Sequence, residues 1–426
     1  MRFLTRHASL QQVHTDESAA QFPPMPYRST VLVIACVLFV IAVTIRILNI
    51  HFLTGDGALL SVWFVYLYEH GFGGLATIDS DYGVTYLTLL WVTTKFGLGP
   101  ITSVKLIAYV FDAALAALTY FILKDRGSSV QTSLLLAACA LFIPTVILNG
   151  AIWGQCDVIY TVFCLASWLA ATKNRQVAAW ALFGIAMSFK IQAVFLLPFL
   201  VLHYYRTNWD GAERHKLLIV NRLSPLAAVL SFFICQSPGL IAGRRLGDML
   251  SSYFVFFSST SGNMKAIYRG GIANVWQLVG RETGPIIWIT TTAVLFTFVL
   301  VLLLLLATLM RVKRGSLEEV YLLPVVLMVM IPYFLPYMHE RYFFAAEVFA
   351  AIFAFITRNR VLAATAVVLQ ITSFIGYAEV LFQPDPVTLS VTPAMMSVVN
   401  AGVLLLLILR LFRITYAQSF SKPIDG

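Results

Sequence analysis

Apolar residues in this chain gather into continuous runs that short polar linkers separate. The run from Ile286 to Met310 contains no charged residue, which predicts a membrane-spanning helix. Continuous runs exclude a membrane β-barrel, because its strands alternate apolar and polar residues. About thirteen apolar segments are predicted, at residues 29–49, 83–98, 101–123, 131–149, 157–171, 177–189, 191–202, 217–237, 285–310, 317–335, 342–357, 361–381 and 393–411.

The linkers between these segments are of two chemical kinds. Basic linkers occupy residues 124–126, 173–175, 203–216, 311–314, 358–360 and 410–413. Linkers with acidic groups, aromatics, glycine and amides occupy residues 50–82, 149–157, 238–284 and 336–341. Because basic loops stay in the cytoplasm, the second kind is predicted to face the outer side of the membrane.

Two segments break a simple alternation across the membrane. Residues 177–202 run from one basic linker to another, so this part of the chain is predicted to enter and leave on the same side. Each half is too short for a hydrocarbon core of about 30 Å, so the tip at residues 188–192 is expected inside the protein at membrane depth. Segment 83–98 is similarly short and is predicted to be a lateral or re-entrant helix.

Composition supports a membrane protein. Of the 426 residues, 59% are hydrophobic and 12% are charged, and the mean hydropathy is +0.83. Soluble domains are about 25% charged, so a soluble enzyme, a disordered chain and a disulfide-stapled secreted domain are excluded. The net charge of +9, from 29 basic and 20 acidic residues, is attributed to membrane orientation and not to a nucleic-acid partner.

The ends of the chain and its cysteines add little chemistry. The polar start does not resemble a cleavable signal peptide, so we expect a cytoplasmic tail at 1–28, one polytopic domain at 29–411 and a cytoplasmic tail at 412–426. The five cysteines are scattered without zinc spacing, and no metal is expected. The absence of an N-glycosylation sequon favours a bacterial inner membrane over an endoplasmic reticulum membrane.

Ionisable residues inside apolar segments are the strongest functional candidates. Lys190, with Gln192 beside it, lies at the tip of the short pair of segments. Lys190 either extends to the membrane interface or forms an anion site inside a cavity, and we favour the cavity. Lys105 and Asp112 lie two helical turns apart and are interpreted as structural partners of neighbouring helices.

The first outer loop carries a carboxylate in a tight backbone setting. Asp56 stands between Gly55 and Gly57, so it is either a catalytic group close to a ligand or a cap or turn residue. An amphipathic helix on the membrane surface is predicted after it, with an apolar face made by Leu59, Leu60, Trp63, Tyr66 and Leu67. Asp79 and Asp81 are interpreted as caps.

Further polar clusters occur in the other outer linkers. The sequence WGQCD contains Trp153, Gln155 and Asp157, although Asp157 alone could be an N-cap. His339, Glu340 and Arg341 stand in a row among aromatics. The long loop 238–284 adds Arg244, Arg245, Lys265, Arg269, Asn274 and Trp276. Basic groups on the outer side either bind a phosphate-bearing ligand or are carried across with a long loop regardless of charge.

In this order, the loop aspartate, WGQCD, SFKIQAVFLLP and MHERYFF resemble motifs of the GT-C superfamily of membrane glycosyltransferases. The similarity is greatest to the bacterial branch related to the GPI-anchor mannosyltransferases and to glycosyltransferase family 87, and it extends over roughly residues 45–350. Two features differ from the family pattern: residues 81–87 read DYGVTYL in place of a proline-rich start, and the first loop has no carboxylate pair.

The resemblance implies an all-α polytopic fold, with about thirteen transmembrane or re-entrant helices and juxtamembrane helices in the first outer loop. It implies inverting transfer of a mannose- or glucose-like hexose from a polyprenyl-phosphate donor to a lipid-linked or polysaccharide acceptor at the outer membrane face. Asp56 matches the family's catalytic base. No cofactor is implied, and nothing in the sequence supports a divalent metal.

Elementary chemistry assigns roles to the remaining candidates. A hydroxyl acceptor needs a general base, whereas a leaving lipid phosphate needs fixed cations. Lys190, His339, Arg341 and Arg269 are the expected phosphate ligands, and Trp153, Gln155, Asp157, Gln192, Asn274, Trp276 and Glu340 the expected substrate contacts. The alternative function is a transporter or flippase of lipid-linked sugars, which also uses broken helices and buried charges.

Overall fold

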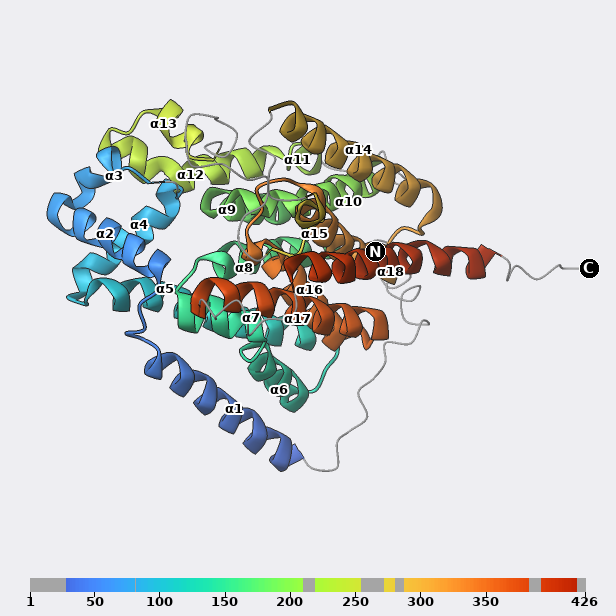
Figure 1. Ribbon diagram of the computed structural model, residues 1–426. Coiled ribbons are helices and arrows are strands. Elements are labelled where there is room, and N and C mark those ends of the chain that lie inside the picture. The colour runs from blue at the N-terminus through green and yellow to red at the C-terminus, as the bar shows by residue number, and fades with distance from the viewer. Residues whose placement is uncertain are drawn as a thin grey trace, which may run out of the picture.

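The computed structural model describes residues 28–80, 82–209, 219–253, 272–279, 287–382 and 392–419, and every regular element in these ranges is a helix (Figure 1). Asp81, Lys265 and Arg269 lie outside the described residues, as do residues 1–27 and 420–426 of the two predicted tails. Residues 412–419 of the predicted C-terminal tail belong to the last helix.

Five described helices are long and apolar enough to cross a membrane. The five spans are Arg28–Leu48 (α1), Pro100–Asp125 (α5), Thr290–Arg311 within α14 (Ile287–Arg311), Arg360–Phe382 (α17) and Pro393–Phe412 within α18 (Pro393–Ser419). A bent pair, Val130–Ala140 (α6) and Pro144–Trp153, would add a sixth, with 57° between its halves. The chain is therefore all-helical over the described residues and compatible with a membrane protein.

The other predicted apolar segments form shorter helices. These are α4 (Val84–Thr93), α8 (Asp157–Thr172), α9 (Gln176–Phe189), α10 (Leu197–Trp209), α12 (Leu226–Ala242), α15 (Leu323–Phe334) and α16 (Phe344–Thr357). Small elements connect them: α2 (Gly55–His70), η2 (Gly71–Gly73), α3 (Gly74–Thr77), η3 (Thr94–Phe96), α7 (Pro144–Val146), η4 (Ile147–Trp153), η5 (Ile191–Leu196), α11 (Ile219–Arg222), α13 (Leu246–Ser251), η7 (Val275–Leu278), η8 (Glu318–Leu322) and η9 (Glu340–Phe343).

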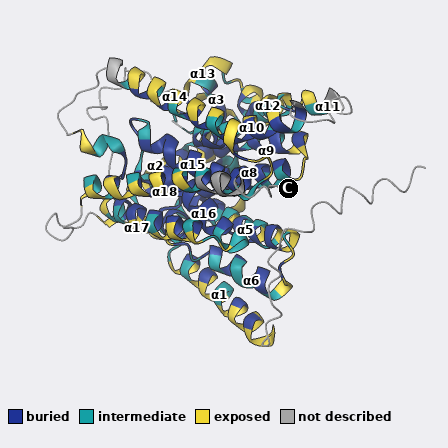
Figure 2. Ribbon diagram, turned by 90° about the vertical axis from the view of Figure 1, so that its right-hand side faces the viewer, coloured by how far each residue is buried: buried dark blue, intermediate teal, exposed yellow. Residues whose placement is uncertain are grey.

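Helices α15 and α16 form the centre of the core. Residues 323–333 of α15 and 344–353 of α16 are all buried, so other helices surround both on every side. By contrast, α1 packs mainly against α6 at the edge of the bundle and has a largely exposed surface (Figure 2). Continuous apolar sequence thus serves two purposes here, because it fills the protein interior in α15 and α16 and covers an outer surface in α1.

Helices α9 and α10 form a hairpin with a break at Lys190, whose backbone is extended. At the tip, Lys190 pairs with Asp157 at the start of α8. At the other end, the rings of Trp180 and Tyr204 lie 5.8 Å apart, and His203 contacts the carbonyl of Ala171 near the end of α8. The chain therefore returns to the end from which it came, as the two basic linkers predicted.

The two kinds of linker lie at opposite ends of α8. Beside its C-terminal end, Lys173 pairs with Asp125, and Arg206 binds Glu319 at 2.7 Å. We call this the basic end. The motif residues gather around the N-terminal end of α8, which we call the cavity end. The basic linkers and the linkers with acidic, aromatic and amide groups are thus separated in space as well as along the sequence.

The helix after Asp56 differs from its prediction in what covers it. Leu60, Trp63 and Leu67 of α2 are buried. Since α2 contacts α4 and α5, its apolar face packs against protein and not against a membrane surface. The large apolar side chains that this helix exposes are Leu59, Val62, Val65 and Tyr68, so Leu59 lies outside the buried stripe. Hydrophobic periodicity located the buried stripe but could not identify its partner.

Polar pairs inside the bundle hold the turn that leads to α8. Asp112 of α5 pairs with Arg46 of α1 at 2.8 Å. Lys105 is fully buried, and its ammonium group donates hydrogen bonds to the carbonyls of Ala151 and Ile152 at the end of the π-helix η4. Gly154, in the left-handed conformation at φ 78°, then ends η4. Lys105 and Asp112 are therefore structural partners of neighbouring segments, as interpreted from the sequence.

Candidate active site

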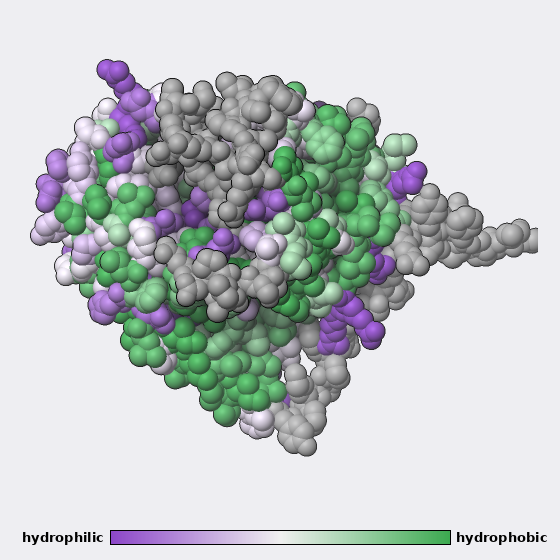
Figure 3. Space-filling model, in the orientation of Figure 1, coloured by the Kyte–Doolittle hydropathy of each residue, from purple (hydrophilic) through white to green (hydrophobic). Residues whose placement is uncertain are grey.

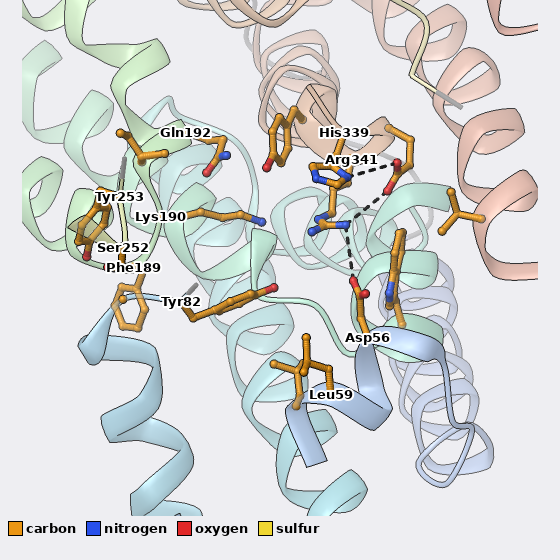
Figure 4. Close-up of a pocket in the computed structure, with 17 residues that line it drawn as sticks. Asp56, Leu59, Tyr82, Phe189, Lys190, Gln192, Ser252, Tyr253, His339 and Arg341 are labelled. Atoms are coloured by element: carbon orange, nitrogen blue, oxygen red, sulfur yellow. Dashed lines mark hydrogen bonds and ion pairs between the residues drawn. The ribbon is translucent and has the colours of Figure 1, made fainter. Parts of the chain in front are cut away.

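A cavity of about 530 Å³ opens at the cavity end of the bundle (Figure 4). Three separate stretches supply its ionisable acidic and basic side chains: Asp56 at the start of α2, Lys190 at the tip of the α9–α10 hairpin, where Gln192 also lines the cavity, and His339 to Arg341 after α15. Figure 3 shows hydrophilic residues in the hollowed centre of this face, between hydrophobic surfaces over α1 and α14. Residues that are far apart in the sequence thus surround one polar space.

Asp56 faces this cavity and does not cap its helix. The cap of α2 is Thr54, whose hydroxyl accepts a hydrogen bond from the amide of Gly57 at 3.0 Å. The side chain of Asp56 is 42% exposed, so a ligand can reach it. Its Oδ2 accepts a hydrogen bond from Gln155, and the Gln155 Oε1 accepts one from the hydroxyl of Tyr82 at 2.7 Å. This chain fixes the orientation of the carboxylate.

Arg341 stands at the centre of the charged groups. Its Nη1 lies 3.6 Å from Asp56 Oδ2, and its Nε lies 3.6 Å from Asp157 Oδ2. Glu340 Oε1 lies 3.4 Å from the same guanidinium. The ring of Trp153 lies 5.2 Å from the guanidinium carbon, within cation–π distance. Arg341 is therefore held on several sides while its side chain still lines the cavity.

Lys190 is the second cation of the cavity, and it shares a carboxylate with Arg341. Asp157 is fully buried, pairs with Lys190, and accepts a hydrogen bond from Asn149 at 2.8 Å. Asp157 is the first residue of α8, and the preceding Cys156 holds the cap position. Lys190 is 12% exposed and lies 5.6 Å from the ring of Tyr342. It therefore faces the cavity from inside the protein.

Glu340 is the buried carboxyl group of this loop. Burial raises the pKa of Glu340 above its ordinary value of 4.5, although the adjacent Arg341 guanidinium opposes the shift. His339 Nδ1 lies 3.8 Å from Glu340 Oε2. Since Glu340 supports the guanidinium that contacts Asp56, its protonation state bears on the charge of the whole cluster.

The remaining predicted residues differ in how they relate to the cavity. Trp153 and Gln192 line it, whereas Gln155 and Asp157 support lining residues from behind. Asn274 is buried and donates to the carbonyl of Leu335 at 3.3 Å, and Trp276 donates to that of Phe334 at 2.8 Å. These two side chains hold the backbone that leads to His339 and do not line the cavity.

The basic residues of the long loop lie apart from the cavity or outside the described chain. Arg244 donates to the carbonyl of Leu75 at 3.3 Å, and neither it nor Arg245 lines the cavity. Arg269 is outside the described residues, so its predicted contact with phosphate stays a prediction.

Several lining residues were not singled out from the sequence. Tyr82, Gly83, Tyr253 and Tyr342 all border the cavity. At Gly83, an added Cβ would lie 2.5 Å from the hydroxyl of Tyr253 and 2.7 Å from the carbonyl of Ser188, so glycine permits this close approach. The one sequence signal was DYGVTYL, where a glycine between aromatic residues begins an apolar segment.

No group of three or more histidine, cysteine, aspartate or glutamate side chains that could hold a metal ion occurs within the described ranges. No protein-family model matches the chain, and no curated protein matches it.

Proposed function

We propose that this protein is an inverting glycosyltransferase of the GT-C superfamily that uses a polyprenyl-phosphate-linked hexose as donor. The acceptor is a lipid-linked sugar or a polysaccharide, and the reaction takes place at the outer face of a bacterial inner membrane. The observation that carries the proposal is a single relationship. A half-exposed carboxylate, Asp56, lies 3.6 Å from the guanidinium of Arg341, in a cavity that a second cation, Lys190, also lines.

The reaction requires few groups. A hydroxyl oxygen of the acceptor attacks the anomeric carbon of the donor sugar, and Asp56 accepts the hydroxyl proton. The bond from the anomeric carbon to the phosphate oxygen breaks, and the electron pair leaves with the lipid phosphate. This leaving group is a stable anion that needs fixed positive charge and no proton, and Arg341 and Lys190 can supply that charge.

Two cations that line the cavity could contact an anionic ligand. Lys190 pairs with the buried carboxylate of Asp157, and Arg341 lies 3.6 Å from Asp157 and Asp56 and 3.4 Å from Glu340. A phosphate group that enters the cavity would therefore share these cations with the carboxylates already beside them. His339 also lines the cavity and is a third candidate ligand.

A flippase of lipid-linked sugars is the alternative that the assay must separate. The test is to incubate the purified protein in lipid nanodiscs with a panel of polyprenyl-phosphate sugars and defined acceptors, and to analyse the products by mass spectrometry. We expect one hexose to be added to an acceptor and free polyprenyl phosphate to appear, with neither product from Asp56→Asn. Movement of a donor across vesicles without a new glycosidic bond would support the flippase instead.

A further inference from the structure

Helix α17 carries three buried polar side chains on one face, although it is one of the candidate membrane spans. Gln370, Ser373 and Tyr377 follow one another at intervals of three and four residues, which places them along the same side of the helix. None of the three lines the main cavity. Because polar groups inside a membrane span are costly, their contacts require an explanation other than direct contact with a ligand.

Two of these side chains fix the helix in place. The amide of Gln370 donates to the hydroxyl of Thr145 at 2.9 Å and accepts from the backbone amide of Thr145 at 3.0 Å. The hydroxyl of Ser373 donates to the buried carboxylate of Glu347 on α16. Since Thr145 lies in α7, directly before η4, these bonds fix the position of α17 relative to η4.

Tyr377 then reaches the charged cluster through hydrogen bonds. The amide nitrogen of Asn149, in η4, donates to the hydroxyl of Tyr377 at 3.1 Å and to Asp157 Oδ2 at 2.8 Å. A carboxylate can only accept, so the nitrogen of this amide has to face Asp157. The same oxygen of Asp157 lies 3.6 Å from Nε of Arg341. Tyr377 is thus connected to the guanidinium through Asn149 and Asp157.

The ring of Tyr377 provides a second connection to the same guanidinium. Its centre lies 5.4 Å from that of Trp153, with an angle of 85° between the rings, so the two pack edge to face. The ring of Trp153 in turn lies 5.2 Å from the guanidinium carbon of Arg341. Tyr377 therefore contacts both Trp153 and the amide that orients Asp157, two groups that lie beside Arg341.

Arg341 depends on such support because its own contacts are loose. Its Nε has no hydrogen-bond partner within the described residues, and its contacts with Asp56 and Asp157 are longer than ordinary hydrogen bonds. The direction of the guanidinium is therefore set by the ring and the carboxylates around it. A shift of Trp153 or Asp157 would move the donor groups that an anion has to meet.

We infer that Tyr377 is a positioning residue, which holds the guanidinium of Arg341 in the orientation that binds an anion in the main cavity. Tyr377 is fully buried and acts from behind the cavity, without contact with the ligand. This inference rests on the proposed function, since it takes the lipid phosphate of the donor as the anion.

The test measures binding of farnesyl phosphate to the full-length protein in detergent by titration calorimetry, without requiring transfer. Tyr377→Phe keeps the ring against Trp153 and removes the hydroxyl that holds Asn149. We expect affinity to fall about three- to tenfold, as for the loss of one buried hydrogen bond. Tyr377→Leu also removes the edge-to-face contact and is expected to bind more weakly than Tyr377→Phe.

A matched control separates positioning from stability. Tyr333→Phe removes another buried tyrosine hydroxyl, which donates to the carbonyl of Ser397 at 3.2 Å, and Tyr333 does not line the cavity. We expect it to lower the melting temperature about as much as Tyr377→Phe does, while the affinity for farnesyl phosphate stays unchanged. If Tyr377→Leu does not fold, the comparison of the two phenylalanine variants decides the question.

A double-mutant cycle tests whether Tyr377 acts through Arg341. In an Arg341→Ala background, where Lys190 and His339 still line the cavity, Tyr377→Phe is expected to change the affinity less than about twofold. The inference is overturned if Tyr377→Phe leaves the affinity unchanged or if Tyr333→Phe loses as much. It is also overturned if the full loss persists without Arg341, or if the wild type does not bind farnesyl phosphate.

The two proposals can fail separately. If Tyr377→Phe weakens the binding of farnesyl phosphate but no sugar donor yields a product, the positioning role stands and the glycosyltransferase proposal falls. If transfer occurs and Tyr377→Phe leaves both this affinity and KM for the donor unchanged, the glycosyltransferase proposal stands and the positioning role falls.

Discussion

Gln155 donates a hydrogen bond to the carboxylate of Asp56, although 99 residues separate the two along the chain. The bond occupies Oδ2, the same oxygen that faces Arg341. Oδ1 is therefore the oxygen available to take a proton from an acceptor. The relationship joins the first outer loop to the turn before α8.

Removing the charge of Asp56 is expected to stop the transfer reaction without preventing the protein from folding. Asp56→Asn keeps the shape of the side chain but cannot accept the acceptor's proton, and loss of a general base costs about 10²- to 10⁴-fold in rate. Turnover is measured with the preferred donor, and donor binding in parallel. Near-normal turnover in the variant would remove Asp56 from the role of base.

The hydrogen bonds that orient Asp56 are expected to affect the rate of transfer more than the binding of the donor. Tyr82→Phe removes the hydroxyl that donates to Gln155, so the amide and the carboxylate it holds gain freedom. We expect a lower kcat with little change in KM for the donor. Tyr86→Phe is the matched control, because no hydrogen-bond partner of that hydroxyl occurs within the described ranges. A fall in kcat of equal size in both variants would show that the Tyr82 hydroxyl has no special role.

The shared carboxylate is expected to be important for stability. Asp157→Ala leaves Lys190 and Arg341 without their common buried partner, and breaking a buried ion pair costs about 3–5 kcal/mol. Chemical unfolding in detergent measures the loss. Asp125→Ala is the control, because its pair with Lys173 is about one-third exposed and is worth about 0–1 kcal/mol. Similar losses in the two variants would contradict the importance of burial.

Close packing at Gly83 predicts that a larger side chain at this position destabilises the protein. Gly83→Ala brings a methyl group against the Tyr253 hydroxyl and the Ser188 carbonyl, next to the hairpin tip. Overpacking of this kind costs about 1–3 kcal/mol, and the displaced tip should weaken donor binding through Lys190. Gly99→Ala has open space and an ordinary φ of −66°, so the melting temperature of that variant should not fall. An unchanged melting temperature in Gly83→Ala would argue against the tight contact.

Protonation of Glu340 should make stability depend on pH. Its pKa is raised in the folded protein, so the folded state binds the proton more tightly than the unfolded state. Its contribution to stability is thus fully present below the unfolded pKa, near 4.5, and is lost as pH rises through the higher folded pKa. Plots of melting temperature against pH for the wild type and for Glu340→Gln should have different slopes across this window. Parallel curves would contradict the shift.

The sequence predicted an all-helical chain, because continuous apolar runs have few other solutions in a membrane. Five of the described helices are long and apolar enough to cross a membrane, so the predicted number of about thirteen membrane helices stays a prediction. It also identified Asp56, Lys190 and Arg341 as candidates, because charge among apolar residues is costly wherever the chain folds. Their mutual contacts could not be predicted, since those depend on how distant helices pack. The partner of the apolar face of α2 was missed for the same reason: an apolar stripe is the same whether lipid or protein covers it. The π-helix η4 leaves no periodic signal in so short a stretch.

The α9–α10 hairpin affects whether the chain crosses the membrane an even or an odd number of times. Asp56 and Arg341 are in contact, so the chain between them must cross the membrane an even number of times, and the hairpin adds none or two. An insertion pathway that extended the two arms into one continuous span would add a single crossing. Every later segment would then be inverted, and Arg341 would lie across the bilayer from Asp56. The extended backbone at Lys190 thus helps to decide whether the two halves of the cavity ever meet.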